Sequence, residues 1–155
     1  MIRTVTEIKD LRINYKAREW CKLPYPDHPR GCPNFGKKVT CPEQAPLIED
    51  FINLNKPKII LAVEFNLSEY VEKMRTKHPY WSDRQLRCLL YWQGSVNKEL
   101  RLLISAVIGL NKLLKITTCP EAMGINVIET ARRIGILVEL KPRTKVFKIA
   151  IGGYE

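Results

Sequence analysis

Four cysteines in the chain have the side chains and the spacing to bind a metal. Cys21, Cys32 and Cys41 lie within 21 residues, and Cys119 follows 78 positions after Cys41. In a reducing compartment, clustered cysteines are more often metal ligands or reactive thiols than disulfides, and five cysteines in total would leave one unpaired. We therefore expect these four residues to bind one metal centre. A disulfide, a redox-active pair or a thiol–disulfide switch is one alternative, and cysteines without a special role are the other.

The spacing of these cysteines also bears on the kind of metal. Structural zinc sites usually draw their ligands from tight Cys-x₂₋₄-Cys turns, and the chain contains none. Iron–sulfur clusters also use four thiolates, and one sequence that binds them ends in Cys-Pro. Proline directly follows Cys32, Cys41 and Cys119. The sequence therefore favours an iron–sulfur cluster held by separate loops, with zinc as the alternative.

Several polar residues accompany the cysteines along the chain. His28, Arg30 and Lys38 lie between the first three, and Glu121 follows Cys119 by two positions. Cations near a thiol favour its charged form, so Arg30 and the pair Lys37-Lys38 are expected to lower thiol pKa values. A carboxylate beside a metal can act as a general base or can orient a ligand. We expect these residues to surround the metal or to face a substrate, unless the cations are simply solvent-exposed.

The fifth cysteine and the stretch after it have a different character. Cys88 lies in the apolar sequence LRCLLYW, which predicts a buried structural thiol, with a spare ligand as the alternative. Residues 91–95, YWQGS, combine two aromatic rings with the amide of Gln93. Aromatic rings near cations can stack on nucleic-acid bases, although at helical spacing they more often belong to a core. Gln93 is therefore a candidate for contact with a substrate.

Proline dominates the segment that carries the first three cysteines. Residues 22–57 hold seven of the ten prolines, and each proline removes a backbone hydrogen-bond donor. Irregular loops of this length are uncommon in compact domains unless they are functional or fixed in place. We therefore expect residues 21–57 to form a long loop that the metal fixes.

The rest of the chain alternates helical and strand patterns. Residues 58–65, KIILAVEF, predict a central buried strand. A capping box at Ser82 and Gln85 predicts one long helix that continues to Leu110, with a close contact or a kink at Gly94. Shorter helices are expected near 47–51, from Ser68 to Arg75, and from Asn126 to Arg133. Residues 136–140 and 145–151 predict a hairpin, and residues 1–20 carry no clear signal.

These elements predict the fold class. We expect one α/β or α+β domain over residues 1–155, with a small mixed sheet of three or four strands, one long helix and the cysteine- and proline-rich loop. The apolar fraction of 45% and the charged fraction of 27% are typical of a soluble globular protein.

Charge and hydropathy limit the partners. The net charge of +10 indicates an anionic partner, such as nucleic acid or another anionic substrate, or else a solvated basic surface. No apolar run reaches the roughly 18 residues that a membrane span needs, and the first residues lack the apolar stretch of a secretory signal. We therefore expect a cytoplasmic protein without membrane contact. The sequence specifies neither its reaction nor its oligomeric state.

Three segments of the chain resemble a known group of sequences. GCPNFGKKVTCPEQAP, LRCLLYWQGS and CPEAMGINVIETARRIGI resemble a group of uncharacterised microbial proteins that are described only as predicted metal-binding and share a cysteine loop. The resemblance covers the chain from about Cys21 to Leu140, although members often have Cys-Pro-Pro where this chain has Cys41-Pro42-Glu43. It implies that Cys21, Cys32, Cys41 and Cys119 are metal ligands, and it implies no reaction.

We therefore expect a metal-binding protein with one iron–sulfur cluster, active in electron transfer or sulfur-related chemistry with a redox partner. The alternative is a zinc-stabilised module that binds nucleic acid without catalysis. Whether the protein is an enzyme stays open.

Overall fold

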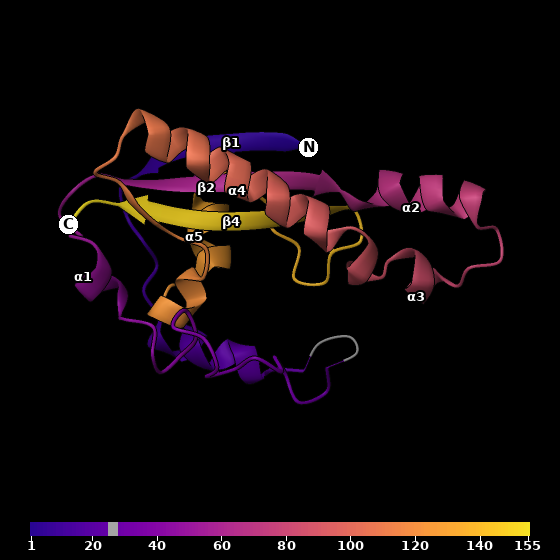
Figure 1. Cartoon of the computed structure of the whole chain (residues 1–155), viewed down its shortest axis with the longest axis horizontal. Helices are drawn as coiled ribbons and strands as arrows, with labels where there is room; N and C mark the ends of the chain where they lie inside the picture. Colours follow the sequence, from indigo (N-terminus) through magenta and orange to yellow (C-terminus); the bar gives the residue numbers. More distant parts are fainter. Residues whose placement is uncertain (25–27) are drawn as a thin grey trace.

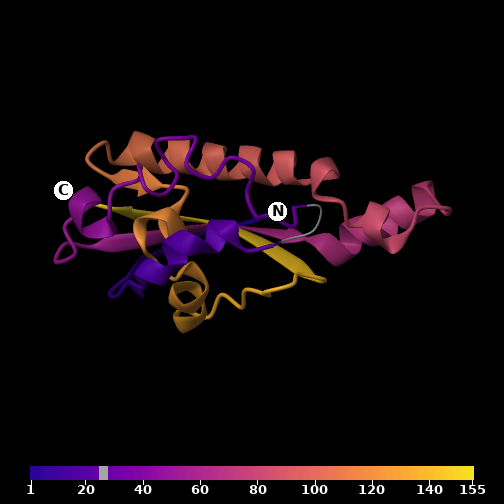
Figure 2. The same cartoon turned by 90° about the horizontal axis from the view of Figure 1, so that it is seen from below.

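A computed structural model describes residues 1–24 and 28–155, and it consists of one antiparallel sheet with helices on both faces (Figures 1 and 2). Pro26, one of the prolines of the predicted loop, lies outside the described residues together with its two neighbours. Figure 2 shows α4 on one side of the sheet and the orange helix α5 on the other. The expected combination of helices with a small sheet is confirmed.

The sheet has four strands in the order β1-β2-β4-β3. They are β1 (Ile2–Ile8), β2 (Lys58–Asn66), β3 (Lys115–Thr117) and β4 (Lys145–Gly153). The predicted central strand is β2, which pairs with β1 on one side and with β4 on the other. All three pairings are antiparallel, whereas the sequence predicted a mixed sheet.

Alternate residues of β2 enter two separate hydrophobic cores, as the two-residue period of a strand requires. Leu61 and Val63 face α4 (Gln93–Leu110), together with α2 (Leu67–Lys77) and α3 (Asp83–Leu86). Ile60 and Ala62 face the other way, toward α1 (Ile48–Phe51) and α5 (Val127–Arg133). The sheet is therefore buried on both faces at its centre, and this explains the continuous apolar run in KIILAVEF.

The long helix expected from Ser82 to Leu110 is interrupted. Its capping box is present, because Ser82 Oγ accepts from Gln85 N at 3.2 Å and Gln85 Oε1 accepts from Ser82 N at 2.8 Å. The backbone then leaves the helical region at Cys88 (φ −59°, ψ 123°), and the short 3-10 helix η2 (Leu89–Tyr91) precedes α4. Of the two alternatives expected at Gly94, the close contact is wrong, since an added Cβ there would meet nothing within 4 Å, whereas the helix does break shortly before it, between Cys88 and Trp92.

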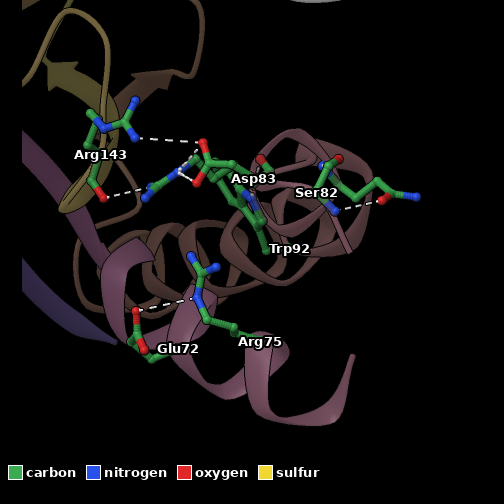
Figure 3. A network of polar contacts seen from close by, with 8 residues as sticks. Glu72, Arg75, Ser82, Asp83, Trp92 and Arg143 are labelled. Carbon is green, nitrogen blue, oxygen red and sulfur yellow. Dashed lines mark hydrogen bonds and ion pairs between the residues drawn. The ribbon is translucent and has the colours of Figure 1, made fainter. Parts of the chain in front are cut away.

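The interruption has a physical cause at Trp92. Trp92 is buried and stacks on Phe65 of β2, with 5.2 Å between ring centroids. Its indole nitrogen donates to the carbonyl of Arg87 at 3.3 Å, where the α3 segment ends. Figure 3 shows that Asp83 faces Arg143 across the same region, at 3.6 Å. The helix therefore breaks at the point where Trp92 packs on the sheet.

The predicted hairpin of residues 136–140 with 145–151 is wrong in its first half. β4 pairs with β2 from Lys145 to Gly152 and with β3 only over Ile151–Gly153, and residues 136–140 form no strand beside it. Residues 136–140 are irregular, and the Glu139 carboxylate accepts from the backbone amides of Arg143 and Thr144. The hydroxyl group of Thr144 also donates to this carboxylate. The hydroxyl hydrogen bond, together with those from the backbone amides, lowers the pKa of Glu139 to about 2.

The shorter helices agree with the sequence. α1 and α5 lie where the patterns predicted them, with Asn126 as the N-cap of α5 and Gly135 at φ +86° just beyond its end. α2 ends before His78 as expected, although its N-cap is Asn66 instead of Ser68. Among residues 1–24 and 28–155, no helix combines the length and the apolar character that crossing a membrane requires.

Candidate metal centre

The four candidate cysteines come from three separate parts of the chain. Cys21 lies in the 3-10 helix η1 (Tyr15–Lys22), Cys32 and Cys41 lie in the turns that follow, and Cys119 is the N-cap of the 3-10 helix η3 (Pro120–Met123). All four are free thiols of intermediate exposure. In Figure 1 the segment that carries the first three lies below the sheet, on the side away from β1.

Contacts between η1 and η3 bring the distant cysteine to the others. The Asn14 amide donates to the carbonyl of Gly124 at 2.7 Å, and Ile13 forms an isolated bridge with Ile125. An added Cβ at Gly124 would lie 2.7 Å from the ring of Tyr15. Gly124 has φ +91°, a conformation that favours glycine. The glycine in CPEAMG thus permits the close approach of the two 3-10 helices.

A second backbone contact fixes Cys32 beside Cys21. The Cys32 amide donates to the Cys21 carbonyl at 2.7 Å. The preceding residue, Gly31, has φ +81° and is buried, and an added Cβ would lie only 2.5 Å from the Cys21 carbonyl oxygen. The Gly-Cys-Pro sequence therefore combines a required glycine with a cysteine of fixed position.

Cys41 is held by a compact turn. Its amide donates to the Lys38 carbonyl at 2.9 Å, and its own carbonyl accepts from the Ala45 amide at 2.7 Å. The thiol donates to the carbonyl of Asn34 at 3.2 Å. Only a protonated thiol can donate this bond, so metal binding at Cys41 would replace it.

The electrostatics of Cys21 link the four cysteines. Burial raises the pKa of the Cys21 thiol, and the charges of Cys32, Glu121, Cys41 and Cys119 raise it further, in that order of effect. Such effects weaken with distance, so the three other thiols lie in the same part of the molecule as Cys21. The expectation that nearby cations lower the pKa is wrong for Cys21. Arg30, Lys37 and Lys38 are all exposed.

Glu121 is the candidate carboxylate, and its charge is one of those that raise the pKa of Cys21. Burial raises the pKa of its carboxyl group, and a backbone hydrogen bond and the charge of Lys148 oppose that effect. The carboxyl group of Glu121 thus lies in an enclosed position next to Cys21.

The remaining candidates have other surroundings. His28 has intermediate exposure, and its expected role beside the metal stays a prediction. Gln93 is exposed at the first position of α4, on the other face of the sheet. Cys88 is half-buried at the N-cap of η2, near Tyr70, whose pKa is raised by burial and further by the charges of Tyr91 and Cys88. The fifth cysteine therefore belongs to the α2–α3 region.

Two threonines beside Cys119 carried no signal in our reading of the sequence. Thr117 Oγ1 accepts from the Cys119 amide at 3.2 Å, and Thr118 Oγ1 lies 3.9 Å from the Cys119 sulfur. Hydroxyl groups that donate to sulfur stabilise the thiolate form. Their position directly before the cysteine in TTCP is the signal that could have identified them.

The gathered thiols do not form a closed set of ligands for a single ion. Within residues 1–24 and 28–155, no three side chains of His, Cys, Asp or Glu are arranged so that they could hold one metal ion. Comparison of the chain with protein-family models, with curated proteins and with solved structures finds no match. The resemblance to predicted metal-binding proteins therefore stays a prediction.

Proposed function

We propose that the protein binds one iron–sulfur cluster through Cys21, Cys32, Cys41 and Cys119. The observation that carries this proposal is the backbone geometry of the cysteine-bearing segments: the Cys32 amide donates to the Cys21 carbonyl at 2.7 Å, and the Asn14 amide donates to the Gly124 carbonyl at 2.7 Å, which joins η1 to η3. Backbone contacts bring the segments that carry the four cysteines together, although 78 positions separate Cys41 from Cys119 in sequence. Convergence of this kind is typical of a shared binding site.

The donor set suits a cluster. Each of the four thiols has intermediate exposure, which limits the access of water and leaves a route for electrons. Proline after three of the cysteines reduces backbone freedom beside the ligand. When bound, a cluster of this kind supplies one-electron transfer or takes part in sulfur chemistry. The chain itself contributes the positions of the thiols and the enclosed carboxyl group of Glu121.

The second candidate is a zinc-stabilised module that binds nucleic acid. It is favoured by the net charge of +10 and by the exposed cations Arg30, Lys37 and Lys38 in the cysteine loop. In this case zinc would stabilise the loop, and the cations would contact phosphates.

The test is the content of metal and acid-labile sulfide in protein purified without oxygen. We expect iron and sulfide in equal amounts, about four of each per chain, together with broad visible absorption. Cys21→Ser and Cys119→Ser should each lose most of the iron. Cys88→Ser is the matched control and should retain it, because Cys88 lies in the α2–α3 region.

Two results would decide against the cluster. Stoichiometric zinc without sulfide would support the alternative, and salt-dependent binding of nucleic acid would then be the next measurement. If Cys21→Ser and Cys119→Ser retain the full metal content, or if the protein retains no metal, the assignment of the ligands is wrong.

A further inference from the structure

Strand β1 lies at the border of the sheet and, within residues 1–24 and 28–155, has a strand partner on one side alone. It pairs with β2 through seven consecutive residues, from Ile2 opposite Glu64 to Ile8 opposite Lys58. Border strands are usually protected by bulges, proline or charged side chains, above all lysine, and the charges of β1 are Arg3 and Glu7. The pairing of β1 is continuous, and the sequence IRTVTEI contains neither proline nor lysine. Ile2 is 63% exposed and Val5 is 47% exposed.

The sequence of β1 is complementary to itself. IRTVTEI reads the same in both directions, except that Arg3 at one end corresponds to Glu7 at the other. In an antiparallel pair with a second copy, centred on Val5, each Arg3 would face a Glu7 of the other copy. The two valines would face each other, and the remaining pairs would be Ile with Ile and Thr with Thr. Opposite charges, threonine pairs and β-branched pairs all stabilise antiparallel strands.

Helix α4 supports this edge from one face. Glu99 of α4 pairs with Arg3 at 2.5 Å, so Arg3 is held on the face of the sheet that α4 covers. In Figure 1, α4 crosses the sheet obliquely and its C-terminal end reaches the border formed by β1. The C-terminal half of the helix thus lies where a second copy would approach.

The exposed face of α4 near this border is apolar. Leu102, Ala106 and Gly109 follow Glu99 at steps of three and four residues, so the four share one side of the helix. Leu102 is 49% exposed, and Ala106 and Gly109 are exposed as well. An added Cβ at Gly109 would meet nothing within 4 Å, so the packing of this chain does not require a glycine there.

We propose that β1 is the interface of a symmetric homodimer. Two copies pair their β1 strands about Val5 and form one continuous eight-stranded sheet, with the two α4 helices antiparallel on the same face. The small residues Ala106 and Gly109 allow these helices to approach each other. In Figure 1 the segment that carries Cys21, Cys32 and Cys41 lies below the strands, away from the edge that β1 forms. Pairing of two β1 strands would therefore leave this segment uncovered. The dimer does not depend on the metal.

The test is the molar mass in solution, measured by light scattering after size exclusion at about 1 to 100 µM. We expect twice the 18.0 kDa of one chain. Glu7→Arg places two arginines opposite each other and should give monomers. Arg3→Glu places two glutamates together and should do the same. A mixture of the two variants restores opposite charges at both positions, so it should recover the double mass.

Control variants distinguish loss of the interface from a general effect of changed charge or from unfolding. Glu72→Arg makes the same change of charge on the exposed surface of α2 and should leave the dimer intact. Leu102→Glu tests the helix contact without altering β1, and circular dichroism checks that each variant is folded. A monomeric wild-type protein would overturn the proposal. So would a dimer that survives both Glu7→Arg and Leu102→Glu.

Discussion

Gly31 fixes the relative positions of the first two cysteines. Its φ of +81° lies in the left-handed region, and the space of a Cβ is already occupied by the backbone of Cys21 and Lys22. A side chain at this position would therefore have to move the backbone that carries a proposed ligand. The stability of variants at position 31 tests this requirement for glycine without any metal.

We expect Gly31→Ala to reduce the free energy of unfolding by more than Gly135→Ala does. Gly135 has φ +86°, but an added Cβ there meets nothing within 4 Å, so that variant bears only the backbone cost of about 1 kcal/mol. Gly31→Ala adds a clash at 2.5 Å with the Cys21 carbonyl oxygen. Urea denaturation of the two variants measures the difference, and equal losses would contradict the close approach at Gly31.

Residue type and spacing identify candidate site residues, but they do not reveal the electrostatic environment of those residues. Cys21, Cys32, Cys41, Cys119 and Glu121 were recognised from residue type and spacing, and their charges do act together on Cys21. The effect of burial on Cys21 was missed, because it depends on how η1 packs. The loop cations were expected close to the thiols because they are close in sequence, yet their side chains are exposed.

At the level of elements, local patterns identified helices and the central strand but not the border strands. β2 was evident from its apolar run, and capping residues marked α3 and α5. β1 alternates partly exposed residues, and β3 has only three residues, so neither carries a strong local signal. The break before α4 depends on Trp92 packing against Phe65, a contact between distant residues that periodicity does not reveal.

Gly94 near the start of α4 provides a test of that helix. It is exposed, and an added Cβ meets nothing within 4 Å. Because alanine favours helix more than glycine, we expect Gly94→Ala to increase the free energy of unfolding by about 0.5–1 kcal/mol. Thermal denaturation measures this change.

Gly153 of β4 is the contrasting position. An added Cβ there would lie 2.7 Å from Cδ1 of Ile52, so Gly153→Ala should lower the melting temperature. If Gly94→Ala also lowers the free energy of unfolding, then Gly94 makes a contact outside the single chain.

For the whole molecule, the two hydrophobic cores are distinct from the cysteine loop. The cores contain residues of the sheet and of α1, α2, α3, α4 and α5. Among the described residues from 22 to 47, the buried ones are Gly31, Pro42 and Ala45. Burial of so little apolar surface supplies little stability, so the order of the loop depends on its backbone contacts and, in our proposal, on the metal.

Removal of the metal should therefore affect one part of the molecule. We expect amide hydrogen exchange to become faster in residues 28–47, and to stay unchanged in β2 and α4, because neither core includes a residue of 28–47. Mass spectrometry of metal-loaded and metal-free protein measures this, and Cys88→Ser treated in the same way is the control. Faster exchange throughout the sheet would mean that the metal stabilises the entire fold. Unchanged exchange in the loop would mean that its backbone contacts are sufficient, and the metal would then have no structural role.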